Sequence, residues 1–235
     1  MPVIAFLPCR AGSQRVPHKN TRPFADRPDG LLGIKLEQLL ACTAIDEVIL
    51  STNDEAVIAI AQPWLQAHQG RMRLDRRPDH LCASSTRTDD VIEYVPSIVP
   101  DGDVLWTHVT SPFFGAEDYA AAIAAYRAAR AAGTHDSLLG VTELKTFIWN
   151  GEGRPINYDR AQEKWPRTQT LTPLYEVNSA IFIAPVPVYR ACDDRVGERP
   201  LIYSIPKDKT VDVDWEEDFV IAAELWRIRK EAHAV

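Results

Sequence analysis

A short polar segment near the N-terminus holds the side chains that could bind an anion. Residues 9–20 read CRAGSQRVPHKN and carry three cations, a glycine and a serine. Glycine lets the backbone approach a ligand closely, serine and free amides donate hydrogen bonds, and cations neutralise oxyanions. These features suit a triphosphate, although the segment matches neither the Walker A pattern nor G-x-G-x-x-G. A solvated surface loop is the alternative that the spacing leaves open. The cations are Arg10, Arg15 and Lys19, and Gly12 and Ser13 lie between the first two.

Two aspartates near the other end of the chain could bind a metal ion. Asp212 and Asp214 alternate with Val211 and Val213. On a strand, both carboxylates would therefore face one side while the valines face the core. Mg²⁺ prefers one or two carboxylates together with substrate phosphates, where it polarises the phosphorus. The alternative is structural, because Asp214 and Glu217 form a D-x-x-E helix-capping pattern and Asp212 is then a solvated strand residue.

Apolar runs and helical spacings alternate along the chain and predict how these side chains are positioned. The alternation through the first 140 residues predicts an α/β fold with a doubly wound, mostly parallel sheet. Ligands bind beyond the carboxyl ends of the strands in such sheets, which is where residues 9–20 fall. Strands are expected at 3–7, 47–51, 103–108, 137–141, 178–184 and 201–205, and helices at 31–42, 53–68 (capped by Asn53 or Asp54), 90–98, 117–132, 186–192 and from 215 onward.

The middle of the chain interrupts this alternation. Residues 143–177 are polar, broken by several glycines and prolines, and carry Trp149 and Trp165. We interpret them as an insertion of irregular loops and short strands that forms a dimer arm or a lid within a single domain spanning 1–235. The two tryptophans are expected to pack within this insertion.

Composition excludes several classes of protein. The 235 residues include 26 Lys+Arg and 33 Asp+Glu, a net charge of −7, with 46% hydrophobic residues. This balance argues against a general nucleic-acid binder, whereas a local cluster of cations can still bind a small anion. Met1–Leu7 lacks the pattern of a signal peptide, and the apolar stretch at 119–126 is too short to span a membrane, so we expect a cytoplasmic protein. The scattered cysteines are expected to be buried free thiols; they are Cys9, Cys42, Cys82 and Cys192.

The order of six short motifs resembles the CMP-sugar synthetases. These are the acylneuraminate cytidylyltransferases and their relatives for Kdo, legionaminate and pseudaminate. The segment R-A-G-S-Q-R-V-P-H-K-N directly after a buried strand is similar to the family's signature, and the other motifs follow in the family's order nearly to the C-terminus. The motifs lie at 10–20, 51–55, 77–81, 110–112, 178–181 and 211–219.

The resemblance implies a function and a set of partners. The expected fold is an α/β nucleotidyltransferase domain with a protruding dimerisation region. The expected reaction uses CTP and a 2-keto sugar acid, requires Mg²⁺ and releases pyrophosphate. A homodimer is expected, with neither nucleic acid nor a membrane as a partner.

The resemblance also implies roles for individual residues. Arg10, Lys19 and Asp212 match catalytic positions, and Asp212 with Asp214 matches the family's metal site. Arg167, Asn178 and Lys145 match positions on the acceptor side, where a surface cation or a buried strand amide is the alternative. The expected nucleotide-binding residues are Arg10, Ala11, Gly12, Ser13, Arg15, Lys19, Asn20, Arg77, Ser84 and His108.

Several positions depart from the family's pattern, mostly on the presumed acceptor side. Gln14 replaces the usual lysine, His108 a common glutamine, Ser84 an aspartate, Glu176 an arginine and Ser179 a glycine. The chemistry of nucleotidyl transfer is therefore expected to be intact, while the acceptor is open. A different acceptor, such as another sugar acid or a phosphonate, and a non-catalytic nucleotide-binding homologue are the alternatives.

Overall fold

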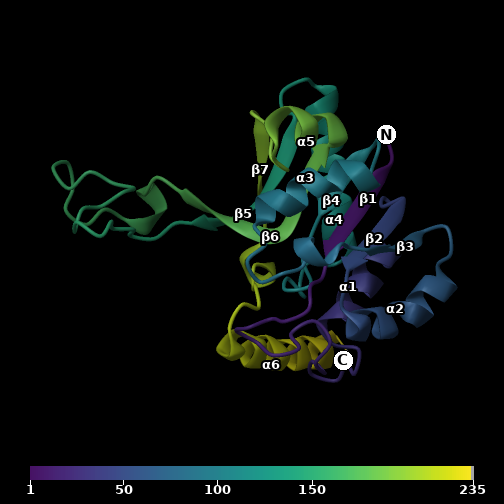
Figure 1. Ribbon diagram of the computed structural model, residues 1–235. Coiled ribbons are helices and arrows are strands. Elements are labelled where there is room, and N and C mark those ends of the chain that lie inside the picture. The colour runs from purple at the N-terminus through teal and green to yellow at the C-terminus, as the bar shows by residue number, and fades with distance from the viewer. Residues whose placement is uncertain (234–235) are drawn as a thin grey trace.

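A seven-stranded sheet forms the centre of the molecule in the computed structural model, which describes residues 1–233 (Figure 1). The strand order is β3-β2-β1-β4-β6-β5-β7. Strands β1 to β4 run parallel, β6 is antiparallel to both of its neighbours, and β7 is parallel to β5. The predicted mostly parallel sheet is therefore confirmed. The strands are β1 (Val3–Pro8), β2 (Glu47–Thr52), β3 (Met72–Arg76), β4 (Asp103–Trp106), β5 (Ser137–Leu144), β6 (Leu174–Pro185) and β7 (Pro200–Ser204).

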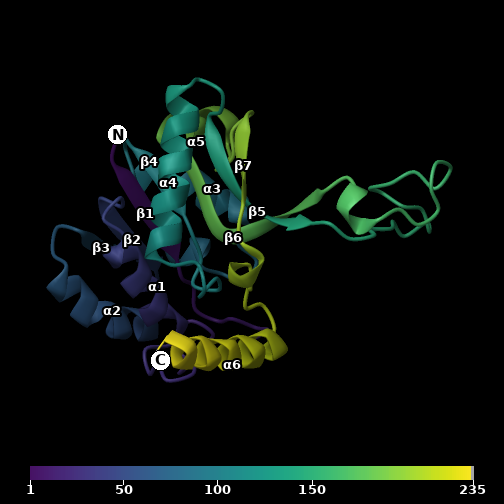
Figure 2. The same cartoon turned by 180° about the vertical axis from the view of Figure 1, so that it is seen from behind.

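Helices cover both faces of this sheet (Figures 1 and 2). On strand β1, Val3, Ala5 and Leu7 belong to the core shared with α1, α2, α4 and α6, while Ile4 and Phe6 face α3 and α5. A strand buried on both faces needs a continuous apolar run, which is why the sequence VIAFL forms β1. The helices are α1 (Gly30–Ala41), α2 (Glu55–Ala67), α3 (Thr88–Ile98), α4 (Ala116–Ala131), α5 (Val186–Cys192) and α6 (Glu216–His233).

Most predicted elements occur within a few residues of their expected bounds, and the misses have a physical cause. Asp54 caps α2 by accepting a hydrogen bond from the Ala56 amide. Strand β3 was not predicted because its sequence, MRLDR, is polar and lies at the sheet edge. Strand β6 begins four residues before the predicted Asn178 because its first part, Leu174–Val177, lies at the foot of the insertion and is mostly exposed.

The two aspartates near the C-terminus do not lie on a strand, contrary to the prediction. Residues 211–214 form an irregular segment after β7. Val213 is fully buried, and its amide donates to the Thr110 carbonyl over 2.9 Å. The alternative, a cap formed by Asp214 and Glu217, is not observed either, because Asp218 accepts the amides of Asp214 and Trp215 at the start of α6.

The segment between β5 and β6 projects from the body as an extended arm (Figure 1). Phe147 packs edge to face against Tyr158 and Trp165, with ring centroids 5.3 and 5.4 Å apart, and Trp149 stacks on Trp165. Asn157 is buried and binds three backbone groups across the arm. Aromatic packing and one buried amide thus order a segment that lacks regular strands.

Three cysteines are buried and free, as predicted, whereas Cys192 is exposed, so the prediction fails for it. Cys192 is the last residue of α5. Across residues 1–233, every helix is too short or too polar to cross a bilayer.

Candidate functional site

A cleft of about 570 Å³ opens beyond the carboxyl ends of β1 and β4. The chain moves from β1 to β2 on one side and later returns to β4 on the other side of β1, so the strand order switches at this point. Crevices at such switch points are the usual ligand sites of open α/β sheets. The predicted residues that line the cleft are Arg10, Ser13, Arg15, Lys19, Asn20, Arg77, His108, Asp212 and Asp214.

The loop after β1 is held in place by one buried side chain and by its own backbone turns. Val16 is fully buried and anchors the middle of the loop in the core. Gly12 has a φ of 73°, a conformation that glycine adopts without strain. The Asn20 amide donates to the Arg10 carbonyl over 3.4 Å and so joins the two ends of the loop. Gly12 itself lines an adjoining cavity of about 210 Å³ that shares Arg10 and Lys19 with the cleft.

Two cations of this loop bind the second aspartate. The Arg15 guanidinium lies 3.0 Å from Asp214 Oδ1, and its Cζ stacks 5.1 Å from the Trp215 ring centroid. Lys19 Nζ donates to the Val213 carbonyl over 2.8 Å and lies 3.4 Å from Asp214 Oδ1. These contacts join residues almost two hundred positions apart, so the tertiary fold brings the cationic loop and the aspartates together as the sequence predicted.

Asp212 differs from Asp214 in its hydrogen bonding. Its Oδ1 atom is buried and has no hydrogen-bond partner among residues 1–233, although the side chain lines the cleft. A buried unpaired carboxylate oxygen is costly, and in a cleft a bound cation can supply the missing partner. No group of three or more His, Cys, Asp or Glu within residues 1–233 is arranged to hold a metal ion. Asp212 and Asp214 alone are the donor set expected for Mg²⁺ bound jointly with phosphates.

Arg77 supports the cleft from below. It is 4% exposed, and its Nη2 donates to the Cys9 carbonyl over 3.3 Å while its Nε donates to Cys82 Sγ. The guanidinium therefore fixes the first residue of the cationic loop. Because it also lines the cleft, the charge of Arg77 adds to the positive potential there.

His108 lies in the cleft as a neutral imidazole. Trp106 Nε1 donates to His108 Nε2 over 2.9 Å, so the ring proton is on Nδ1. Burial and the nearby cations Arg195 and Lys19 lower the pKa of His108 to about 3. The side chain can therefore donate one hydrogen bond into the cleft, but it does not gain a charge near neutral pH.

One wall of the cleft was not predicted from the sequence. Thr86, Arg87 and Thr88, at the N-terminus of α3, line it together with Gln14. Arg87 holds Asp90 through its side chain and its backbone amide. The signal that could have found this wall was the run R-T-D-D, since acidic residues favour a helix N-terminus and this helix follows a parallel strand.

Several predicted site residues do not reach the cleft. Ala11 and Ser84 are exposed and do not line it. Asn178 is buried, donates to the Thr210 carbonyl and to Thr142, and accepts from the Ala180 amide, which is the structural alternative that the sequence left open. Lys145 pairs with Glu143 at the foot of the arm, and Arg167 is exposed on the arm.

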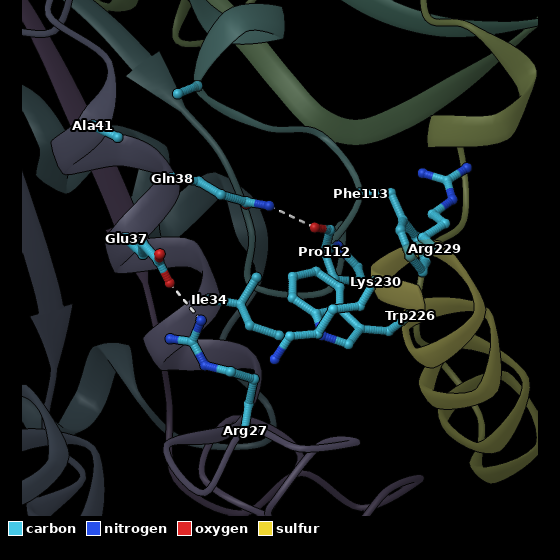
Figure 3. A pocket seen from close by; sticks show the side chains of 11 residues that line it. Arg27, Ile34, Glu37, Gln38, Ala41, Pro112, Phe113, Trp226, Arg229 and Lys230 are labelled. Carbon is cyan, nitrogen blue, oxygen red and sulfur yellow. Dashed lines mark hydrogen bonds and ion pairs between the residues drawn. The ribbon is translucent and has the colours of Figure 1, made fainter. Parts of the chain in front are cut away.

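A second cavity of about 590 Å³ lies between α1 and α6 (Figure 3). Its floor is apolar and includes Ile34, Phe113 and Trp226. The Arg27–Glu37 pair lies at its edge, and Gln38 donates to the Pro112 carbonyl (Figure 3). None of the predicted site residues lines it. The first cleft, with five cationic side chains and two carboxylates, is therefore the candidate site for a charged ligand.

Known proteins are similar to this chain over nearly its whole length. Pseudaminic acid cytidylyltransferase of Campylobacter jejuni is 24% identical over 235 residues, covering 97% of this chain and 98% of that one. CMP-N,N'-diacetyllegionaminic acid synthase of Legionella pneumophila is 24% identical, covering 99% of each chain. N-acylneuraminate cytidylyltransferase of Escherichia coli is 26% identical over 94% of this chain and 51% of that longer protein.

Solved structures share the fold at low sequence identity. A CMP:2-keto-3-deoxy-manno-octonic acid synthetase complexed with CTP has a TM-score of 0.65 at 16% identity, covering 97% of this chain and all of that one. A 4-diphosphocytidyl-2C-methyl-D-erythritol synthase from Anaerococcus prevotii has a TM-score of 0.66 at 15% identity. The family model described as cytidylyltransferase matches residues 4–193, from the first strand through α5. On that match, which includes the cationic loop, the chain belongs to the cytidylyltransferase family.

Proposed function

We propose that the protein transfers a cytidylyl group from CTP to the anomeric hydroxyl of a 2-keto-3-deoxy sugar acid of the sialic acid type. The observation that carries this proposal is the cleft that unites the cationic loop with Asp212 and Asp214. Relatives that match nearly the full length are named as cytidylyltransferases or synthases of such acids. The enzyme is further proposed to work in the cytoplasm, where three buried free thiols stay reduced.

The triphosphate is proposed to lie along the loop after β1. Arg10 is exposed at the cleft and makes no side-chain hydrogen bond within residues 1–233, so its guanidinium is available for phosphate oxygens. Lys19 uses two of its three donors on Val213 and Asp214 and has one left for a phosphate. His108 Nδ1–H adds a neutral donor at the end of β4. Positioning and charge stabilisation by these groups account for most of the expected catalysis.

Mg²⁺ is the proposed cofactor, and the residues present fit it. Asp212 would hold the ion through its unpaired carboxylate, with Asp214 as the second oxygen donor. When bound, the ion neutralises phosphate charge and makes the α-phosphorus more electrophilic. Arg15 and Lys19 keep Asp214 oriented before the nucleotide arrives.

The reaction balances as an in-line substitution at phosphorus. The acceptor hydroxyl oxygen forms a bond to the α-phosphorus, the bond between the α-phosphorus and the bridging oxygen breaks, and pyrophosphate leaves with that electron pair. The hydroxyl proton passes to solvent. Arg10 and Lys19 are proposed to stabilise the charge that builds up on the departing phosphates.

Pyrophosphate release tests the proposal. The purified protein is incubated with CTP, Mg²⁺ and a panel of nonulosonic acids, with ATP, GTP and UTP as nucleotide controls. Fast turnover with CTP and one acid is expected. Absence of pyrophosphate with every nucleotide and acid would contradict the proposal, and CTP binding without turnover would indicate a non-catalytic homologue.

A homodimer formed through the arm is also proposed. Ile156, Trp165, Tyr175 and Val177 are 47–64% exposed on the arm and its foot, which is an unusual concentration of exposed apolar surface. Because the arm carries Arg167 away from its own body (Figure 1), an acceptor contact by Arg167 requires a second copy of the chain. Mixing inactive Arg167→Ala and Asp212→Asn proteins should then restore part of the activity. Sedimentation of a monomer at micromolar concentration would refute the dimer.

A different acceptor is the second candidate, favoured by one observation. Glu176 is exposed at the foot of the arm, and the nearby Lys145 is paired with Glu143, so this region has little free positive charge for a carboxylate. Competition among sugar acids, amino-substituted sugar acids and phosphonates separates the candidates. The acceptor with the highest kcat/KM identifies the class, and preference for a phosphonate would replace the sugar-acid assignment.

A further inference from the structure

A fully buried lysine lies beneath the cleft, away from solvent and from the ligand-binding surface. Lys35 on α1 is 0% exposed. Its Nζ donates to the carbonyls of Ser111 and Phe114 over 2.9 and 3.1 Å, and to the Tyr119 hydroxyl over 2.9 Å. All three donors of the ammonium therefore have acceptors. The partners lie on the turn after β4 and at the start of α4, so one charge links three elements.

The hydrogen bonds continue from Lys35 across the core. Because Thr107 gives its only hydroxyl proton to the Ala180 carbonyl, the Tyr119 hydroxyl donates to Thr107 Oγ1, 2.7 Å away, while it accepts from Lys35. Thr107 in turn donates to the Ala180 carbonyl over 2.7 Å. These hydrogen bonds join the residue after β4 to the middle of β6, and the residue before Ala180, Ser179, lines the cleft. The network is fully satisfied, as a buried polar network must be to add order.

The turn that Lys35 holds positions the metal-site segment. Thr110 lines the cleft, and its carbonyl accepts the amide of Val213, which lies between the two aspartates. Gln38, one turn further along α1, donates to the Pro112 carbonyl over 2.6 Å (Figure 3). Two side chains of α1 thus hold the backbone of residues 111–114, and the adjoining Thr110 carbonyl binds the Val213 amide.

Keeping a charge at this position is costly. Burial lowers the pKa of Lys35 to about 7, while the carboxylates of Asp118 and Asp212 favour its charged form. An apolar side chain would fill the same space without this cost. The ammonium instead supplies three hydrogen-bond donors to two backbone carbonyls and one hydroxyl oxygen in the core.

From these contacts we infer that Lys35 is a positioning residue for the nucleotidyl-transfer site. It holds the turn at residues 107–114 so that Thr110 fixes Val213 and Asp212 faces the cleft. This inference rests on the proposed function only in taking Asp212 as the ion ligand.

One variant on α1 and two matched variants on α4 test the inference. Lys35→Met removes the charge and keeps the stem, and Tyr119→Phe removes one link of the network. Tyr126→Phe is the control, because Tyr126 is equally buried on α4 and its hydroxyl binds Asp103 at the far end of β4. Amide hydrogen exchange is followed in peptides spanning 107–116 and 208–216. The affinity for Mn²⁺ in the presence of CTP is measured by electron paramagnetic resonance, without turnover.

The inference predicts different results for the two positions on α4. Exchange at the Val213 amide should accelerate in both Lys35→Met and Tyr119→Phe. Mn²⁺ affinity should weaken about tenfold in Lys35→Met, which loses a charged donor, and about threefold in Tyr119→Phe, which loses one neutral hydroxyl. Tyr126→Phe should stay within about twofold of the wild type even if it is less stable. Identical behaviour of Tyr119→Phe and Tyr126→Phe would overturn the inference.

One further variant separates this inference from the proposed function. Asp212→Asn should abolish Mn²⁺ binding while leaving the exchange of the Val213 amide close to that of the wild type. Full Mn²⁺ binding by Asp212→Asn would refute the proposed ion site. The exchange of the Val213 amide in Lys35→Met would then still decide whether Lys35 holds that segment.

Discussion

Replacing Asp212 with asparagine should not lower the stability of the ligand-free protein, but it should nearly abolish the enzymatic activity. Asp212 Oδ1 is buried without a hydrogen-bond partner among residues 1–233. An unsatisfied buried polar atom costs about 1–3 kcal/mol and more when it is charged, and only the extra cost of the charge is removed by asparagine. Asparagine keeps the shape and removes the charge. The loss of attraction to the Lys35 ammonium offsets part of the gain. We therefore expect the free energy of unfolding to rise by between zero and about 1 kcal/mol.

The same substitution should remove most of the ligand-dependent stabilisation and the turnover. With Mg²⁺ and CTP at about 100 times their dissociation constant, the wild type should gain about 2.7 kcal/mol, and the variant much less. Turnover should fall by about 100-fold or more, which corresponds to about 2.7 kcal/mol of barrier. Urea denaturation with and without Mg²⁺ and CTP, combined with pyrophosphate release, measures both quantities.

Asp214→Asn is the matched control for this experiment. Asp214 is 45% exposed at its side chain and pairs with Arg15 and Lys19, so its loss should lower stability by no more than about 1 kcal/mol. If Asp212→Asn loses more than about 1 kcal/mol without ligand, Asp212 is a structural aspartate. Retention of turnover within about tenfold would equally refute the assigned role.

Three further predictions follow from the contacts in and around the cleft. The pKa of His108 is lowered to about 3 from an unfolded value near 6.5, so the unfolded chain binds the proton at a higher pH than the folded chain. The stability that is present above pH 6.5 is therefore lost as the pH falls towards 3. His108→Gln should remove this loss, which is at most about 1.4 kcal/mol per pH unit. Urea denaturation at pH 7, 5.5 and 4.5 measures how the free energy of unfolding depends on pH, and equal dependence in the wild type and the variant would show that the imidazole is charged. Arg15→Ala should raise the KM for CTP and change stability by less than about 1 kcal/mol, because its pair with Asp214 is half-exposed; an unchanged KM would remove Arg15 from the site. Asn178→Ala should cost about 1–3 kcal/mol of stability without changing the KM for the acceptor, and the reverse pattern in denaturation and kinetics would restore its predicted acceptor role.

The α/β sheet and the loop that lines the candidate cleft could both be predicted from the sequence. Strand β1 is buried on both faces, and the resulting apolar run is visible without any structure. The cations at residues 10–19 follow this run directly, and a loop after a parallel strand opens onto the ligand edge of the sheet. The burial of a strand shows in the apolar residues of that strand, and the loop that follows it is simply the next segment of the sequence, so both could be inferred without a structure.

The hydrogen-bond and ion-pair partners of the polar side chains could be identified only from the folded chain. Asp212 and Asp214 are alike in the sequence, but Asp214 binds Arg15 and Lys19, whereas one Asp212 oxygen has no partner in the part of the chain that the structure describes. Asn178 could have served a substrate, and the fold instead commits its amide to the backbone. Lys35 had no visible role in the sequence because its acceptors lie some 80 residues further along the chain. Hydrogen bonds between distant segments leave no periodic pattern, and so the assignment of roles within the cleft required the folded chain.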